Sequence, residues 1–271
     1  MNWSRFVLEN VLGGVDSVIT CEEPSGVKIS GTPLWWEAFT VSHPSHRHQG
    51  RFSSNVQELI SMGADVNAVG RMPGKTGGYE APALWCAAMA VRHGNEEGLV
   101  MAKHLIKAGA DVNAVGVWGG SECTPLFLAL KGLQYTGKEA AKDLAKLLID
   151  AGANVNTVGK CSGSEGAPLL MAVLAATNRG AASQDFGVEL TKTLIEKGAD
   201  VNHPGKSGDT ILTPLMVALT SARDDDLAGV YVARLLVEWC ADVTTASSDD
   251  LARSIVLEES AFRRFRYLYV R

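Results

Sequence analysis

The octet "GADVNAVG" occupies residues 63–70 and returns unchanged at 109–116. Three related copies follow, "GANVNTVG" at 152–159, "GADVNHPG" at 198–205 and the weaker "CADVTTAS" at 240–247. The first residues of successive copies are 46, 43, 46 and 42 positions apart. A regular spacing of this size indicates a repeat architecture, in which each copy marks the same point of one structural unit.

A second short motif keeps the same spacing. It reads "TPLWW", "APALW", "TPLFL", "APLLM" and "TPLMV", beginning at residues 32, 81, 124, 167 and 213. Each copy precedes one of the octets, and glycine-rich stretches separate one unit from the next. Because two independent motifs share one period, the sequence predicts five full repeat units.

Each unit carries the signals of two helices. In "TPLFLAL" the hydroxyl of Thr124 can cap a helix, and Pro125 falls at the first helical position, where its missing N–H has no cost. The segment 136–153 then places apolar residues three and four positions apart, which gives one buried helix face. Gly152 follows at the point where a left-handed residue ends a helix. The polar, glycine-rich stretch after it is typical of a turn. We predict helix, turn, helix and an extended finger in each unit.

The "TPL" or "APL" openings and the "GADVNA" closings resemble the ankyrin-repeat family over roughly residues 14–245. This resemblance implies stacked helix pairs in a curved solenoid that binds proteins without catalysis. The family's usual histidine after "TPL" is absent, so we expect apolar packing to replace its hydrogen bond. The residues at its position are Trp35, Leu84, Phe127, Leu170 and Met216. The fold class that we predict is an all-α solenoid of stacked helix-turn-helix ankyrin-type repeats, with finger or hairpin loops and helical caps.

The units are longer than the family pattern by about seven residues, which fits one added turn on each of two antiparallel helices. The ends of the chain are read as caps, because terminal repeats of a stack need a polar outer face. The predicted organisation is a capping half-repeat, five repeats and a pair of capping helices, with these bounds: 1–31, 32–246 (about 32–80, 81–123, 124–166, 167–212 and 213–246) and 247–271.

Composition narrows the function classes. The chain has 271 residues and a formal net charge of −5, which gives no general attraction to nucleic acid or to an anionic membrane. The N-terminal stretch lacks the pattern of a signal peptide, and no apolar run reaches the length of a membrane span. The five cysteines are odd in number and scattered, which favours reduced thiols and a cytoplasmic location.

Four stretches could carry chemistry, and each has a simpler interpretation. "GRMPGKTGG" (70–78) has one residue too few for a phosphate-binding loop, so we interpret it as a hairpin tip. "HPSHRH" (43–48) could share a metal, but a solvated loop is favoured. Cys123 and Cys161 fall in neighbouring fingers and could approach each other, though buried or free thiols are favoured. "RRFRYLYVR" (263–271) fits a capping helix better than a nucleic-acid site. We predict that the chain is not an enzyme and that it binds no metal ion and no cofactor.

The surface expected to bind a partner lies on the finger tips and the inner helices. A tryptophan in a glycine-flanked finger tip is typical of a binding hot spot. The basic finger positions, on an acidic protein, indicate a partner with an acidic surface, unless they serve only to keep the tips soluble. The expected contact residues are Arg71, Lys75, Tyr79, Trp118, Lys160 and Lys206 on the fingers and Phe39, Met89, Lys131 and Thr220 on the helices.

Taken together, these features predict a cytoplasmic protein-binding module that acts on one partner protein through its concave face. An inhibitor, an immunity-type antitoxin or an adaptor fits this role, and no small-molecule substrate is expected. The alternatives are a secreted bacterial effector that binds a host protein, a metal- or nucleotide-dependent enzyme that uses residues 43–48 or 74–78, and nucleic-acid binding through the C-terminal tail.

Overall fold

The structure is a computed structural model that describes residues 14–22, 27–42, 52–73, 78–178, 183–223 and 226–242. The chain divides into two compact units. Unit 1 comprises residues 1–132, 140–154 and 159–162, and unit 2 comprises residues 133–139, 155–158 and 163–271. Residues 1–13 of the predicted N-terminal cap and the whole predicted C-terminal cap, 247–271, lie outside the described residues.

The described residues contain the helix pairs that the two repeated motifs predict. The first helices of the repeats are α2 (Pro33–Ser42), α4 (Ala83–Arg92), α6 (Pro125–Thr136), α8 (Pro168–Ala176) and α10 (Pro214–Arg223). The second helices are α3 (Phe52–Ser61), α5 (Glu97–Lys107), α7 (Glu139–Asp150), α9 (Ser183–Glu196) and α11 (Leu227–Glu238). Four of the first helices begin at the proline of the motif, and the hydroxyl of Thr124 accepts a hydrogen bond from the Phe127 amide, as expected of a cap.

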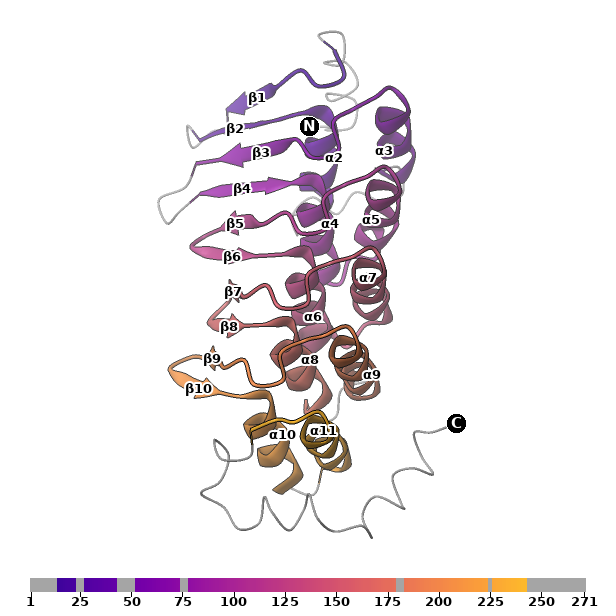
Figure 1. The fold of residues 1–271 in the computed structure, drawn as a ribbon. Helices are drawn as coiled ribbons and strands as arrows, with labels where there is room; N and C mark the ends of the chain where they lie inside the picture. The colour runs from indigo at the N-terminus through magenta and orange to yellow at the C-terminus, as the bar shows by residue number, and fades with distance from the viewer. Residues whose placement is uncertain are drawn as a thin grey trace. The chain divides into compact units, whose positions relative to one another are not determined.

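The prediction of an all-α fold is wrong, because the fingers are β-hairpins whose strands pair into sheet. The strands of unit 1 are β1 (Ile19–Glu22), β2 (Lys28–Gly31), β3 (Val69–Met72), β4 (Tyr79–Pro82), β5 (Gly116–Trp118), β6 (Ser121–Cys123) and β7 (Gly159–Cys161). Those of unit 2 are β8 (Ser164–Gly166), β9 (Gly205–Ser207) and β10 (Thr210–Leu212). Within each unit they follow one another in sequence order, and the paired strands are antiparallel (Figure 1).

Pairing between successive hairpins makes the sheet. Each hairpin of unit 1 is bonded to the hairpin of the next repeat: β2 pairs with β3, β4 with β5, and β6 with β7. These pairings satisfy backbone N–H and C=O groups that isolated fingers would leave to water. The strands are short and rich in glycine, which weakens any local strand signal, so the sequence predicted finger or hairpin loops but not their pairing into a sheet.

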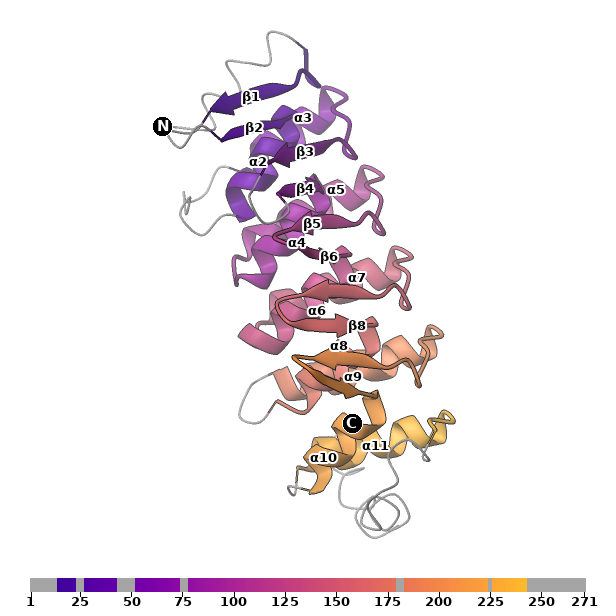
Figure 2. The same ribbon diagram turned by 90° about the vertical axis from the view of Figure 1, so that its left-hand side faces the viewer.

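Unit 1 has three layers, which Figures 1 and 2 show from two sides. The hairpin sheet forms one layer, the first helices α2 and α4 lie next to it, and the second helices α3 and α5 lie outermost. Helix α2 packs on α3 and α4, and α4 packs on α5. Every residue of α2 and α4 is buried, whereas the second helices bury one face only. The core of the unit is therefore centred on the first helices.

The opening glycine of the octet ends the second helix, as predicted. Gly63, Gly109, Gly152 and Gly198 have φ between 87° and 90°, a region that residues with a side chain rarely adopt. The residue after each glycine donates its N–H to the carbonyl five positions earlier, at 2.9–3.1 Å. This bond satisfies a carbonyl that the helix end would otherwise leave open. In the last copy Cys240 takes the same place with φ +65°, which is a strained conformation for cysteine.

The asparagine of the octet links one repeat to the next. Its Oδ1 accepts a hydrogen bond from a backbone amide of the following octet at 2.6–2.8 Å. We call this set the asparagine ladder: Asn67, Asn113, Asn156 and Asn202. Before the first octet, Asp16 takes the same part and accepts from the amide of Asp65 at 2.8 Å. The near-identity of the first four octets therefore has a local cause, since each of them supplies both the acceptor and the donor of a repeated bond.

Candidate partner-binding face

The sheet of unit 1 presents glycines to the first helices, and large side chains lie directly on them. A Cβ added at Gly70 would come within 2.0 Å of the indole of Trp35. The same arrangement recurs along the unit: Trp35 on Gly70, Trp85 on Gly116 and Phe127 on Gly159. Because the space between hairpin and helix is filled in this way, the base of the face offers no opening at these positions.

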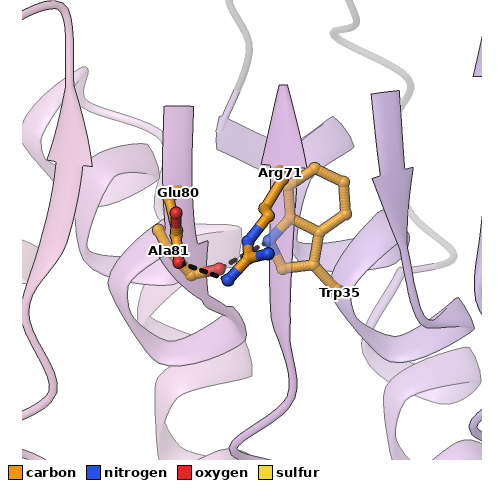
Figure 3. A network of polar contacts seen from close by, with 4 residues as sticks. All are labelled: Trp35, Arg71, Glu80 and Ala81. Carbon is orange, nitrogen blue, oxygen red and sulfur yellow. Dashed lines mark hydrogen bonds and ion pairs between the residues drawn. The ribbon is translucent and has the colours of Figure 1, made fainter. Parts of the chain in front are cut away.

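The tryptophans that replace the family's histidine also form hydrogen bonds between repeats. The indole Nε1 of Trp35 donates to the carbonyl of Ala81 at 2.7 Å (Figure 3), and Trp85 Nε1 donates to the carbonyl of Cys123 at 2.8 Å. The expectation of apolar packing alone is thus incomplete. The residue at this position of the second repeat is Trp85 rather than Leu84, because α4 begins one residue later than the motif predicts.

The opposite face of the sheet carries a row of residues, which we call the charged strand row. Strand register places its members side by side across unit 1: Ser30, Arg71, Glu80, Val117, Glu122 and Lys160. Side chains alternate between the two faces of a strand, so this row points away from the glycines that contact the helices. Its charged members are exposed.

The charged strand row carries both signs, which the sequence did not predict: Arg71 and Lys160 are basic, and Glu80 and Glu122 between them are acidic. Arg71 Nη2 forms an ion pair with Glu80 Oε1 at 2.9 Å (Figure 3), and Lys160 lies opposite Glu122. In unit 2, Lys206 lies opposite Glu165. Arg71, Lys160 and Lys206 therefore each have a carboxylate next to them. The acidic partner surface stays a prediction, which was drawn from the basic residues alone.

Three of the four helix residues expected to bind a partner are part of the core. Phe39, Met89 and Lys131 are each at most 4% exposed. Phe39 stacks on Trp35 with ring centroids 4.8 Å apart, which shows why it is unavailable at the surface. Thr220 is exposed, and its hydroxyl donates to the carbonyl of Met216 at 2.8 Å. Lys75 lies outside the described residues.

Trp118 is a large exposed side chain at a finger tip of unit 1. It is 39% exposed, and its ring meets that of the exposed His93 edge to face, with centroids 6.5 Å apart. Its cross-strand neighbour Tyr79, also expected at the surface, is buried. The Tyr79 hydroxyl lies 2.9 Å from the thiol of Cys86. Burial raises the pKa of Tyr79 well above its usual value, so this hydroxyl is neutral and structural.

A buried arginine, which sequence analysis missed, lies behind this surface. Arg92 ends α4 and is 9% exposed, with Nη2 donating to the hydroxyl of Ser162 at 2.6 Å. Its Nη1 lies 3.5 Å from Nε2 of His93. Ser162 occupies the hairpin turn after β7 with φ +50°. We call Arg92, His93, Trp118 and Ser162 the fingertip cluster. Its members come from three separate segments, so no local sequence signal could have grouped them.

Most of the stretches considered for other chemistry lie outside the residues that the structure describes. Residues 43–48, 74–77 and 263–271 lie outside the described residues. Within the described ranges, no three His, Cys, Asp or Glu side chains gather in a way that could hold a metal ion. In the same ranges, each helix is too short or too polar to cross a lipid bilayer.

Residues 81–117 match the family model described as Ankyrin repeat. This match supports the resemblance drawn from the repeated motifs, and it covers the segment from β4 through α4 and α5 to β5. A search of the curated proteins found no match to the chain. Ankyrin repeats are in general non-enzymatic protein-binding modules, so the match assigns this segment to that broad class.

Proposed function

We propose that this ankyrin-repeat protein acts by binding one partner protein, and that the fingertip cluster of unit 1 is the centre of the contact. The observation that carries the proposal is the exposure of Trp118 at a hairpin tip, next to His93, whose ring in turn lies beside Arg92. Tryptophan and arginine are the residue types most enriched among binding hot spots, and they act from the middle of a contact surface.

The charged strand row would orient the partner. Since it carries two acidic residues between two basic ones, it favours a partner surface with both charges in the complementary order over a uniformly acidic patch. Binding in the cytoplasm as an inhibitor, an immunity-type antitoxin or an adaptor fits this role. A secreted effector that binds a host protein would use the same face.

The test uses two exposed tryptophans as a matched pair. The chain, its Trp118→Ala variant and its Trp239→Ala variant serve as baits in extract from the source cells. Trp239 is a suitable control because it is 50% exposed at the C-cap of α11. The partner is the protein that both the wild type and Trp239→Ala retain, and Trp118→Ala is expected to retain less of it.

Titration calorimetry with the purified partner then measures each affinity. Removal of a hot-spot tryptophan is expected to weaken binding by about 2 kcal/mol, or about 30-fold. The variant Lys160→Glu should have a smaller effect, because Lys160 belongs to the charged strand row and not to the cluster. If Trp118→Ala binds as tightly as Trp239→Ala, the fingertip cluster is not the contact.

A further inference from the structure

Strands β6 and β7 bring two thiols together in unit 1. Because Glu122 pairs with Lys160, the residues Cys123 and Cys161 lie diagonally across the two strands, on the face toward the helices. Each is 1% exposed, and both are free thiols. Gly159 lies directly opposite Cys123 and has no side chain, so nothing on that residue separates the two sulfurs.

The surroundings of the two thiols differ, and they favour a charge on Cys161. The Sγ of Cys161 lies 3.6 Å from the hydroxyl of Ser162, which in turn accepts from Arg92. The pKa of Cys161 is lowered by a hydrogen bond from Cys123, with help from Ser162 and from the positive charge of Arg92, although burial opposes this. The pKa of Cys123 is raised by the same hydrogen bond and by burial.

We propose that Cys123 and Cys161 are a reversible oxidation site at which hydrogen peroxide converts the two thiols to a disulfide. The Cys161 thiolate attacks one oxygen of the peroxide, which forms a sulfenic acid and releases hydroxide. The thiol of Cys123 then attacks the Cys161 sulfur. The S–S bond forms, and the sulfenic hydroxyl leaves as water with the proton of Cys123. In sum, two thiols and one peroxide give one disulfide and two waters.

Peroxide suits this site better than a bulky oxidant. Both sulfurs are buried, but Ser162, the next residue after Cys161, is exposed at the hairpin turn, so a small molecule has only a short path to the thiolate. Arg92 is a positioning residue here, because it holds the Ser162 hydroxyl beside the sulfur and adds a positive charge to its surroundings.

Cys86 provides an internal comparison. It is fully buried in α4, and burial raises its pKa to about 12, with the Tyr79 hydroxyl as its hydrogen-bond partner. Since the thiolate is the nucleophile in this chemistry, Cys86 should stay reduced at neutral pH under conditions that oxidise Cys161. Cys86 and Cys161 are both buried, so burial alone does not predict which of them is oxidised. The positive charge of Arg92 near Cys161 does.

The experiment is peptide mapping of the full chain in the Cys240→Ser background, which removes an exposed thiol. The folded protein is treated with hydrogen peroxide, blocked with N-ethylmaleimide, denatured and digested with trypsin. Cys123 falls in the tryptic peptide 108–131 and Cys161 in the peptide 161–179, each with a single cysteine. A species that joins these two peptides and disappears on reduction is the expected result.

Two variants make the result decisive. With Cys123→Ser, dimedone should capture a sulfenic acid on Cys161, and Arg92→Lys should slow that capture while circular dichroism confirms the fold. With Cys161→Ser, Cys123 should resist oxidation as Cys86 does. The proposal is overturned if the linked peptides form only in denaturant, or if Cys161 reacts with peroxide no faster than Cys86. Neither readout depends on a partner protein, so the outcome is separate from that of the proposed function.

Discussion

The carboxyl group of Glu37 should make unit 1 lose stability as pH rises. Glu37 is buried in the middle of α2, and Asn55 Nδ2 donates to its Oε1 at 3.2 Å. Among the described residues, its Oε2 has no hydrogen-bond partner. Burial raises the pKa of Glu37 from 4.5 to about 7, against the opposing effect of Asn55. The folded protein therefore binds this proton more tightly than the unfolded chain does.

The size of the effect follows from the difference between the two pKa values. One pKa unit corresponds to about 1.4 kcal/mol, so the shift of Glu37 amounts to about 3 kcal/mol in all. The stability that this protonated group contributes is fully present below the pKa of the unfolded chain. It falls as pH rises toward the folded pKa near 7, and above that pH no further stability is lost through this group. Glu37→Gln removes the charge but keeps the shape. The variant should exceed the wild type by less than about 1 kcal/mol at pH 5 and by about 3 kcal/mol at pH 8.

Urea denaturation of both proteins at several pH values, followed by tryptophan fluorescence, measures this difference. Trp35 and Trp36 lie two and one residues before Glu37 and report on the same helix. Other groups titrate in both proteins and cancel in the comparison. The matched control Glu58→Gln changes an exposed carboxyl of α3 and should show no such trend. If the wild type and Glu37→Gln stay equally far apart from pH 5 to pH 8, Glu37 is not protonated in the folded state and the reasoning fails.

Three further substitutions test the packing between repeats by urea denaturation. Gly70→Ala places a methyl group against Trp35 and should lower the free energy of unfolding by roughly 2 kcal/mol or more. The control Val69→Ala changes an exposed neighbour and should lower it by less than about 0.5 kcal/mol. Equal losses of stability in the two variants would contradict the close approach of Gly70 to Trp35. Asn113→Ala removes one acceptor of the asparagine ladder and should cost about 1 kcal/mol, with part of the loss recovered by Asn113→Asp, which keeps the oxygen. Cys240→Gly relieves a strained φ of +65° and should raise stability by about 0.5 kcal/mol, so a less stable variant would refute the strain.

Local signals predicted the helices of this protein well, for identifiable reasons. Proline at the first helical position and glycine after the last turn act through their own backbone preferences. The proline recurs in all five repeats and the glycine in four, so their spacing located the outer ends of the helix pairs to within a residue or two. The exception is the second repeat, where the motif begins at Ala81 but Pro82 precedes the helix.

Features that depend on contact between repeats could not be read in the same way. Hairpin pairing joins residues more than 30 positions apart, such as Glu80 and Val117, and leaves no local pattern. Arg92 and Ser162 are separated by 70 positions, and each has an ordinary sequence context. Lys131 was expected at the binding surface because of its position on an inner helix, although the structure buries it completely.

The backbone donors of the asparagine ladder all lie C-terminal to their acceptors, which limits how the protein can be shortened. Each ladder oxygen accepts from an amide of the following octet, as Asp16 does from Asp65, and the side-chain amides of Asn113, Asn156 and Asn202 donate to the first carbonyl of that octet. A fragment cut at its N-terminal end therefore leaves a backbone N–H without its acceptor, whereas a cut at the C-terminal end leaves an asparagine side chain that can turn toward water. Truncation from the two ends should thus be unequal in its consequences, and a minimal fragment of unit 1 must retain Asp16.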